Sequence, residues 1–195
     1  MKERIVRVFN DHARLQKEFL KHNTEALAQV AAVLLEAFRK GRTVFFFGNG
    51  GSAADAQHLA AEYVNRFRLN RRALPAIALT VDTSVITSIA NDTGFERVFA
   101  RQLEALGRPD DVAVGISTSG GSANVIEAVR EARRGGLVTV GFAGGDGGAL
   151  LRETDHCVVV PSKTTARVQE MHIVAGHAIC DIVEQEIVHP THETR

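Results

Sequence analysis

From residue 43 onward, short apolar runs alternate with segments in which apolar residues recur every three or four positions. Apolar runs of this length are typical of strands buried on both faces, and the periodicity between them is typical of helices. The pattern predicts an α/β fold, a three-layer αβα sandwich with a five-stranded parallel sheet. The expected strands are 43–47, 75–80, 111–116, 137–142 and 156–160, and the expected helices are 52–68, 84–106 with a break near 91–94, 122–134, 147–153 and 165–188.

Residues 1–40 also carry a helical pattern, but they precede the first strand and lie outside the alternation. We expect these N-terminal helices to be an extension of a single domain that spans 1–195, and to dock on a neighbouring subunit in a helical bundle. Most of their apolar positions are three or four apart, and these positions are Ile5, Phe9, Leu15, Phe19, Leu27, Val30, Leu34 and Phe38.

The composition of the chain excludes several classes of protein. Lys and Arg total 23 and Asp and Glu total 23, so the basic excess of a nucleic-acid-binding protein is absent. The first residues are charged rather than apolar, unlike a secretory signal, and no apolar stretch is long enough to span a bilayer. We therefore expect a cytoplasmic protein that binds neither nucleic acid nor membrane. Its two cysteines make no disulfide framework.

Two glycine-rich turns each follow an apolar run and precede a helical segment. The first, Gly48–Ser52, has three glycines within four residues, which lets the backbone approach a ligand closely. The helix that begins near Ser52 would add unpaired N–H groups and the positive end of its dipole. The turn lacks the Lys-Ser/Thr end of a Walker A motif. Its alternative interpretation is a tight connection in which Ser52 caps the helix.

The second turn, 117–122, places four hydroxyl groups around two glycines. A hydroxyl cluster at a helix N-terminus can bind a phosphate dianion without a lysine. The alternative is a solvated loop capped by Ser122, but four hydroxyls exceed what capping requires. Because ligands bind at the carboxyl ends of parallel strands, we expect both turns to line one mouth. The hydroxyls belong to Ser117, Thr118, Ser119 and Ser122.

Four side chains on two helices could carry acid–base or metal chemistry. His58 and Glu62 are four residues apart on the helix after the first turn and share a face. Gln169 and His177 are eight apart on the last helix and share a side. If the helices converge, the four could hold a divalent metal such as zinc, or Glu62 and His177 could act without metal as base and acid. A solvated surface pair and a histidine at the core edge are the ordinary alternatives.

Two further segments are polar or rich in glycine. Asn91-Asp92 interrupts a helical pattern, either as a helix-ending turn or as a rim that contacts sugar hydroxyls. Residues 144–148 (Gly-Gly-Asp-Gly-Gly) lack hydroxyls, and we expect a mobile loop there. A phosphate-binding turn and acid–base groups at one mouth predict an enzyme that acts on a phosphorylated small molecule.

These motifs, in this order, resemble the sugar isomerase (SIS) domain of the phosphoheptose isomerase family. The resemblance covers about residues 5 to 188 and rests on 48–52, 56–62, 90–92, 115–125 and 167–172. It implies a flavodoxin-like SIS fold. It also implies a homotetramer with active sites at subunit interfaces, and some members of the family bind zinc.

The resemblance implies an aldose–ketose isomerase that converts sedoheptulose 7-phosphate to D-glycero-D-manno-heptose 7-phosphate through an enediol, in heptose biosynthesis. Glu62 would be the general base and His177 the acid, on opposite sides of the substrate. A zinc ion in each subunit would be held by His58, Glu62, Gln169 and His177. The implied substrate-binding residues are Asn49, Gly50, Gly51, Ser52, Glu62, Asn91, Asp92, Ser117, Thr118, Ser119, Ser122 and Gln169.

A related family offers a non-catalytic alternative, the DnaA initiator-associating protein of bacterial replication. Four stretches are at least as similar to that adaptor, namely 56–58, 65–67, 75–79 and 169–172. In the adaptor the acid–base positions are non-ionisable and an Arg lies in the hydroxyl turn, whereas this chain has Glu62, His177 and Ser119-Gly120-Gly121. The enzyme is therefore favoured over an initiator-binding adaptor and over a regulator that only senses a sugar phosphate. Gly121 departs from the Asn frequent in isomerases, which should affect loop flexibility more than activity.

Overall fold

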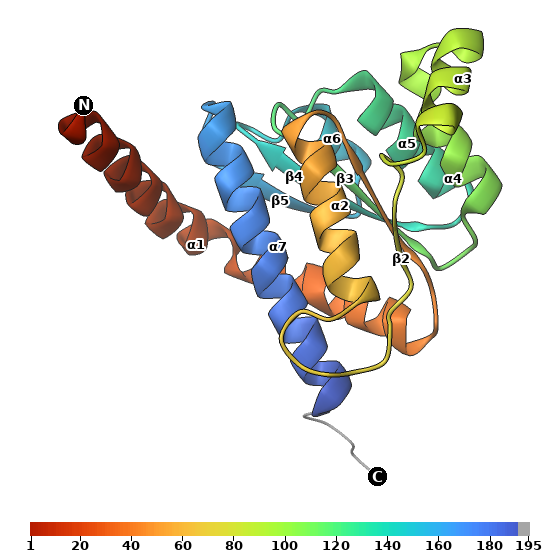
Figure 1. Cartoon of the computed structure of the whole chain (residues 1–195), viewed down its shortest axis with the longest axis horizontal. Coiled ribbons are helices and arrows are strands. Elements are labelled where there is room, and N and C mark those ends of the chain that lie inside the picture. The colour runs from red at the N-terminus through yellow and green to blue at the C-terminus, as the bar shows by residue number, and fades with distance from the viewer. Residues whose placement is uncertain (191–195) are drawn as a thin grey trace.

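A five-stranded parallel sheet in the order β2-β1-β3-β4-β5 forms the centre of the computed structural model, which describes residues 1–190 (Figure 1). Every neighbouring pair of strands is parallel, and this order is that of flavodoxin-like doubly wound folds. The predicted fold class is therefore confirmed. The strands are β1 (Val44–Gly48), β2 (Ala76–Ala78), β3 (Val112–Ser117), β4 (Val138–Gly144) and β5 (His156–Val160).

Helices cover both faces of the sheet because successive strand residues point to opposite sides. Phe46 packs into the core under the first helix layer, whereas Phe45 and Phe47 pack into the core under the second. The first layer consists of α1 (Lys2–Arg39), α2 (Gly51–Val64) and α7 (Thr165–Val188). The second consists of α3 (Thr83–Thr93), the 3-10 turn η1 (Phe95–Arg97), α4 (Ala100–Leu106), α5 (Ala123–Arg134) and α6 (Gly148–Glu153).

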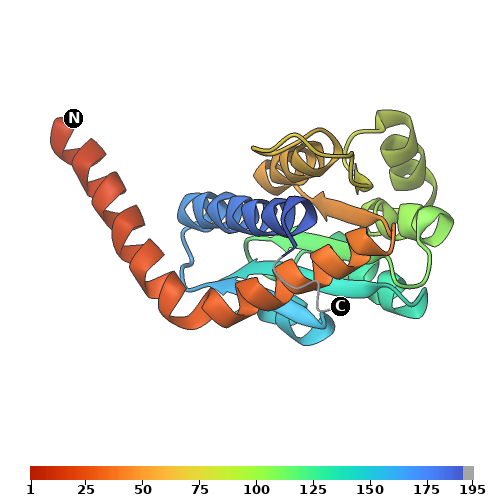
Figure 2. The same cartoon turned by 90° about the horizontal axis from the view of Figure 1, so that it is seen from below.

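The N-terminal extension is one continuous helix rather than several. Its second half, from Phe19 onward, is buried against the body, and Figure 2 shows the first half projecting away from it. Apolar side chains on this projecting arm meet solvent, with Ile5 54% and Phe9 72% exposed. The arm therefore carries an apolar surface that the single chain does not cover.

The predicted break near 91–94 is confirmed. Helix α3 ends at Thr93, and Gly94 has φ 100°, a conformation that side chains other than glycine rarely adopt. Among residues 1–190, no helix is both long enough and apolar enough to cross a membrane. The assignment of 1–195 to a single domain stays a prediction, and residues 191–195 lie outside the described part of the chain.

Candidate active site

The first glycine turn connects β1 to α2 and leaves the start of that helix uncapped. Gly50, at φ 54°, is the N-cap, and it offers no side chain to the helix N–H groups. Ser52 is the second helical residue and is buried, so the interpretation of Ser52 as the cap is wrong. The first turn of α2 also carries no acidic residue. The N–H groups of Ser52 and Ala53 donate to the carbonyls of Asn49 and Gly50, at 3.0 and 3.1 Å. The N–H groups of Gly50 and Gly51 have no hydrogen-bond partner among the described residues and are available to an anion.

The hydroxyl turn connects β3, the neighbour of β1 in the sheet, to α5. Ser117 and Ser122 bring their Oγ atoms to 2.9 Å, and the Gly121 N–H donates to Ser119 Oγ at 3.2 Å. Ser122 is the N-cap residue of α5, but its side chain makes no capping hydrogen bond. Its hydroxyl contacts Ser117 instead, so this helix N-terminus also keeps free donors beside a cluster of hydroxyls.

A reciprocal amide pair joins the two turns. Asn49 and Asn124 each donate their side-chain amide to the other's oxygen, at 2.8 Å in both directions. Sequence reasoning missed Asn124 as a site residue, although it lies only two positions after the hydroxyl turn. The pair confirms that the two turns lie together at the carboxyl end of the sheet.

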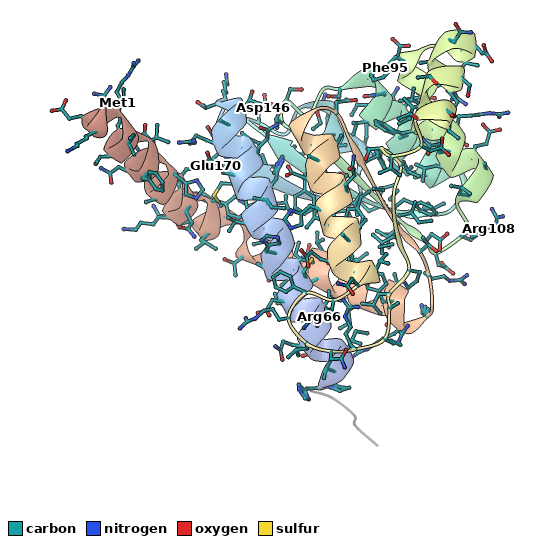
Figure 3. All side chains as sticks on the ribbon, viewed as in Figure 1. Met1, Arg66, Phe95, Arg108, Asp146 and Glu170 are labelled. Carbon is teal, nitrogen blue, oxygen red and sulfur yellow. The ribbon has the colours of Figure 1, made fainter. Side chains whose placement is uncertain are left out.

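The third glycine-rich segment, 144–148, packs against the hydroxyl turn. Gly120 has φ 65°, and a Cβ built on it would overlap the carbonyl oxygen of Gly147. The Leu150 N–H donates to the Gly120 carbonyl at 2.9 Å, and the Gly145 N–H is within 3.0 Å of two carbonyl oxygens. The expectation of a mobile loop is not supported, because Gly147 packs against Gly120 and the Gly145 N–H is hydrogen-bonded to the carbonyls of Val160 and Ser162. Figure 3 labels Asp146 at this end of the molecule.

His58, Glu62 and His177 meet where α2 and α7 run side by side (Figure 1). His58 Nε2 lies 3.1 Å from Glu62 Oε1 and 3.2 Å from His177 Nε2. One donor or acceptor atom from each residue lies within 4.8 Å of the others. The side chains of His58 and Glu62 are 46% and 22% exposed, so the cluster is open to solvent in the single chain.

The predicted base and acid do not lie far apart. Glu62 and His177 were expected on opposite sides of a substrate, but a polar atom of each lies within 4.8 Å of the other. This separation suits proton transfers at a carbon and an oxygen that are neighbours in one molecule.

Gln169 lies at the mouth end of the same seam rather than among the three clustered residues. A Cβ on Gly51 would overlap the Gln169 amide, so glycine at this position lets that side chain lie against the start of α2. Gly51 precedes His58 by seven residues, about two helical turns or 10 Å. The structure thus brings together three of the four predicted ligands, and the complete set stays a prediction.

Asp55 is a polar residue near this seam that sequence reasoning did not single out. It lies one turn before His58, and its Oδ2 is buried without a hydrogen-bond partner among the described residues. Burial raises the pKa of Asp55, while His58 opposes the change. An acidic residue three positions before a candidate ligand on the same helix is the sequence signal that could have identified it.

Asn91 and Asp92 lie on α3, which follows the carboxyl end of β2. The Asn91 amide donates to the Asp92 carboxylate at 2.7 Å, and both residues are exposed. They are helical residues in the last turn of α3, which ends at Thr93, rather than a turn that follows the helix. Their role as a rim that contacts sugar hydroxyls stays a prediction.

Comparisons with known proteins agree with this geometry. The model of the SIS domain family matches residues 8–144. Phosphoheptose isomerase of Roseiflexus sp. is 54% identical over 173 residues, 89% of this chain and 88% of the relative. The enzyme of that name from Aquifex aeolicus is 46% identical over 187 residues, 96% and 98% of the two chains.

Solved structures extend the likeness to three dimensions. The structure of phosphoheptose isomerase from Neisseria gonorrhoeae has a TM-score of 0.90 and 43% identity, over 94% of this chain and 98% of that chain. The Francisella tularensis enzyme of the same name also has a TM-score of 0.90, with 37% identity over 94% and 97%. The chain therefore belongs to the SIS domain family and, within it, to the phosphoheptose isomerases.

Proposed function

We propose that this isomerase interconverts sedoheptulose 7-phosphate and D-glycero-D-manno-heptose 7-phosphate, an aldose–ketose isomerisation in heptose biosynthesis. The observation that carries the proposal is the cluster of His58, Glu62 and His177, which lies about two helical turns along α2 from the uncapped start of that helix. The Asn49–Asn124 pair joins this start to the uncapped start of α5. The adaptor alternative receives no support, because the relatives reported above carry the name of the enzyme.

In this proposal, the side chains divide proton transfer between carbon and oxygen. Glu62 takes the proton from the carbon next to the carbonyl and returns it to the neighbouring carbon, by way of an enediol. His177 moves a proton between the two oxygens, and the contact with His58 orients its imidazole. No net proton is gained or lost, as an isomerisation requires.

The hydroxyl turn is the proposed phosphate site. The hydroxyl of Ser117 lies within hydrogen-bond reach of those of Ser119 and Ser122, at 3.5 and 2.9 Å, so rotation of these hydroxyls can redirect donors toward a phosphate oxygen. The free N–H groups at the start of α5 and its dipole favour the same anion. Thr118, in the same turn, is half-buried and adds a fourth hydroxyl.

The clustered side chains fit a zinc ion. Tetrahedral zinc with Zn–N bonds of about 2.0–2.1 Å holds neighbouring ligand atoms about 3.3 Å apart. The observed distances of 3.2 Å and 3.1 Å are close to this value, and two imidazoles with a carboxylate are donors that zinc prefers. His58, Glu62 and His177 would hold the ion, with Gln169 as the proposed fourth ligand. Bound zinc would polarise the carbonyl group and stabilise negative charge on its oxygen.

Incubation of the purified protein with sedoheptulose 7-phosphate tests the proposed isomerisation and the proposed zinc site. We expect the aldose to form, and a coupled assay measures its formation. We also expect a chelator to lower turnover and added zinc to restore it. Zinc bound to the purified chain is measured in parallel by atomic emission. If neither condition gives turnover from correctly folded protein, the isomerase proposal fails and the initiator-binding adaptor becomes the better hypothesis.

We also propose that the enzyme is a cytoplasmic homotetramer whose sites lie at subunit interfaces. The exposed apolar arm of α1 and the partly exposed cluster are the features that a neighbouring chain would cover. Light scattering is expected to give four times the mass of 21.1 kDa. A charge on the arm, Phe9→Glu, is expected to lower that mass, and an unchanged tetramer in this variant would exclude the arm from the interface.

A further inference from the structure

A buried ion pair lies beneath the acid–base cluster and takes no part in the proposed chemistry. Glu184 and Arg71 have side chains that are 1% and 3% exposed, with Arg71 Nε 3.1 Å from Glu184 Oε1. This contact is an ion pair that lacks the angle of a hydrogen bond. Glu184 follows His177 by seven residues on α7, so the two side chains lie on one face about two turns apart. A buried charge pair is costly to desolvate and calls for an explanation.

The carboxylate of Glu184 binds the backbone of the segment that follows α2. It accepts hydrogen bonds from the N–H groups of Phe67, Arg68 and Leu69, at 2.8, 2.6 and 2.7 Å. Figure 1 shows this segment crossing in front of α7, and Figure 3 labels Arg66 on it. Burial acts to raise the pKa of Glu184, but the backbone N–H groups together with Arg71 outweigh it and hold the pKa below its usual value. The carboxylate therefore stays ionised and keeps all three bonds.

The segment that Glu184 binds carries Phe67, whose ring packs on His177. The centroids of the Phe67 and His177 rings are 5.3 Å apart, with an interplanar angle of 34°. His177 also contacts His58 through Nε2. The imidazole thus contacts both the ring on the segment that Glu184 binds and the candidate acid–base cluster.

Arg71, the ion-pair partner of Glu184, also binds the helix that carries the candidate base. Its guanidinium donates to the backbone carbonyl of Glu62 at 2.7 Å and to that of Tyr63 at 2.8 Å. These carbonyls belong to the last turn of α2, where no N–H group of the helix reaches them, and that of Tyr63 also accepts from the Leu74 N–H at 3.1 Å. One buried ion pair therefore fixes both the end of α2 behind Glu62 and the ring beside His177.

We propose that Glu184 is a positioning residue for the isomerase: through the backbone at 67–69 it holds Phe67 against His177 and so sets the orientation of that imidazole toward His58 and Glu62. The inference rests on the proposed role of His177. It assigns to Glu184 an effect on the chemical step that is separate from substrate binding. The hydroxyl turn lies near Val168 at the start of α7, where both approach Gly144, whereas Glu184 lies near the end of that helix.

The test compares Glu184→Gln with Phe67→Leu. The first substitution replaces the carboxylate by an amide, which would turn a donor toward backbone N–H groups, whereas Phe67→Leu removes the ring and leaves the ion pair intact. Each variant is expected to lower kcat about 10–100-fold with KM unchanged. The kcat of the double variant is expected to be no lower than that of the less active single variant, because both substitutions act on the same imidazole.

Asp181→Asn is the matched control. Asp181 lies on the same helix and pairs with Arg68 of the same segment at 3.4 Å, but on the exposed surface. Loss of this pair is expected to leave kcat unchanged. If kcat depended on any weakening of the segment 67–69, it would fall in Asp181→Asn as well.

A spectroscopic readout separates this inference from the proposed reaction. The ring resonances of His177, observed by NMR, are expected to shift in Glu184→Gln and in Phe67→Leu but not in Asp181→Asn. If the wild-type protein lacks turnover, the proposed function fails while the resonances still test the positioning. Native kcat and unmoved His177 resonances in Phe67→Leu would overturn the inference, even where Glu184→Gln fails to fold.

Discussion

The variant Glu62→Gln is expected to fold as the wild type does and to lose turnover by about 10²–10⁴-fold, the range for removal of a general acid or base. The amide has nearly the size of the carboxylate and can still contact His58, but it cannot accept a proton from carbon. Aldose formation from sedoheptulose 7-phosphate measures the loss. Because the amide is also a weaker zinc ligand, the assay is run with zinc in excess.

The control for Glu62→Gln is Glu36→Gln, which removes a carboxylate from the exposed surface of α1. Glu36 pairs with Lys40 on the surface, with both side chains 57% exposed, so its loss is expected to leave kcat unchanged. Circular dichroism of both variants checks the fold. Substantial turnover by Glu62→Gln would remove Glu62 as the base and leave proton transfer to another member of the cluster.

The second large effect is expected from Gly120→Ala in the hydroxyl turn. Gly120 has φ 65°, and its Cβ position is occupied by the carbonyl group of Gly147, so alanine forces the two turns apart. Backbone strain and overpacking are each worth about 1–3 kcal/mol, so the free energy of unfolding should fall by about 2–6 kcal/mol. The displaced hydroxyls should also raise KM. Denaturant unfolding and steady-state kinetics measure the two effects.

Gly121→Ala is a control within the same turn. Gly121 has no positive φ, and the nearest atom to an added Cβ is Ser119 Oγ at 3.7 Å, which is an ordinary contact. Stability and KM are therefore expected to stay near their wild-type values. Equal loss of stability in the two variants would show that the packing of the turn against Gly147 does not decide its conformation.

Most of the fold could be predicted because its signals are local. Strand β3 was expected at 111–116 and is Val112–Ser117, and its residues are buried on both faces, as the continuous apolar run indicates. The predicted strand 75–80 shrinks to Ala76–Ala78 because β2 is the edge of the sheet, paired only with β1. No apolar period distinguishes an edge strand from a central one.

The site was predicted less completely, and the missed parts have a common cause. The two turns were recognisable because glycines and hydroxyls act on the backbone within a few residues. Asn124, by contrast, looks like an ordinary residue at the start of a helix until it meets Asn49, 75 positions earlier. Glu184 reads as a surface charge on an amphipathic helix, yet it is fully buried by a segment 115 to 117 positions away.

The sequence by itself determined the order of strands and helices, the two turns at the strand ends, and the residue types able to bind phosphate and transfer protons. Each of these follows from periodicity or from backbone chemistry within a few residues. Only the tertiary structure decided that His58 meets His177, 119 positions away, that Gly147 supports Gly120, and that Gln169 lies beside Gly51. These contacts depend on how α2 packs along α7 and how the loops stack at the sheet edge, and distances between segments far apart in the chain are set by that packing rather than by local pattern.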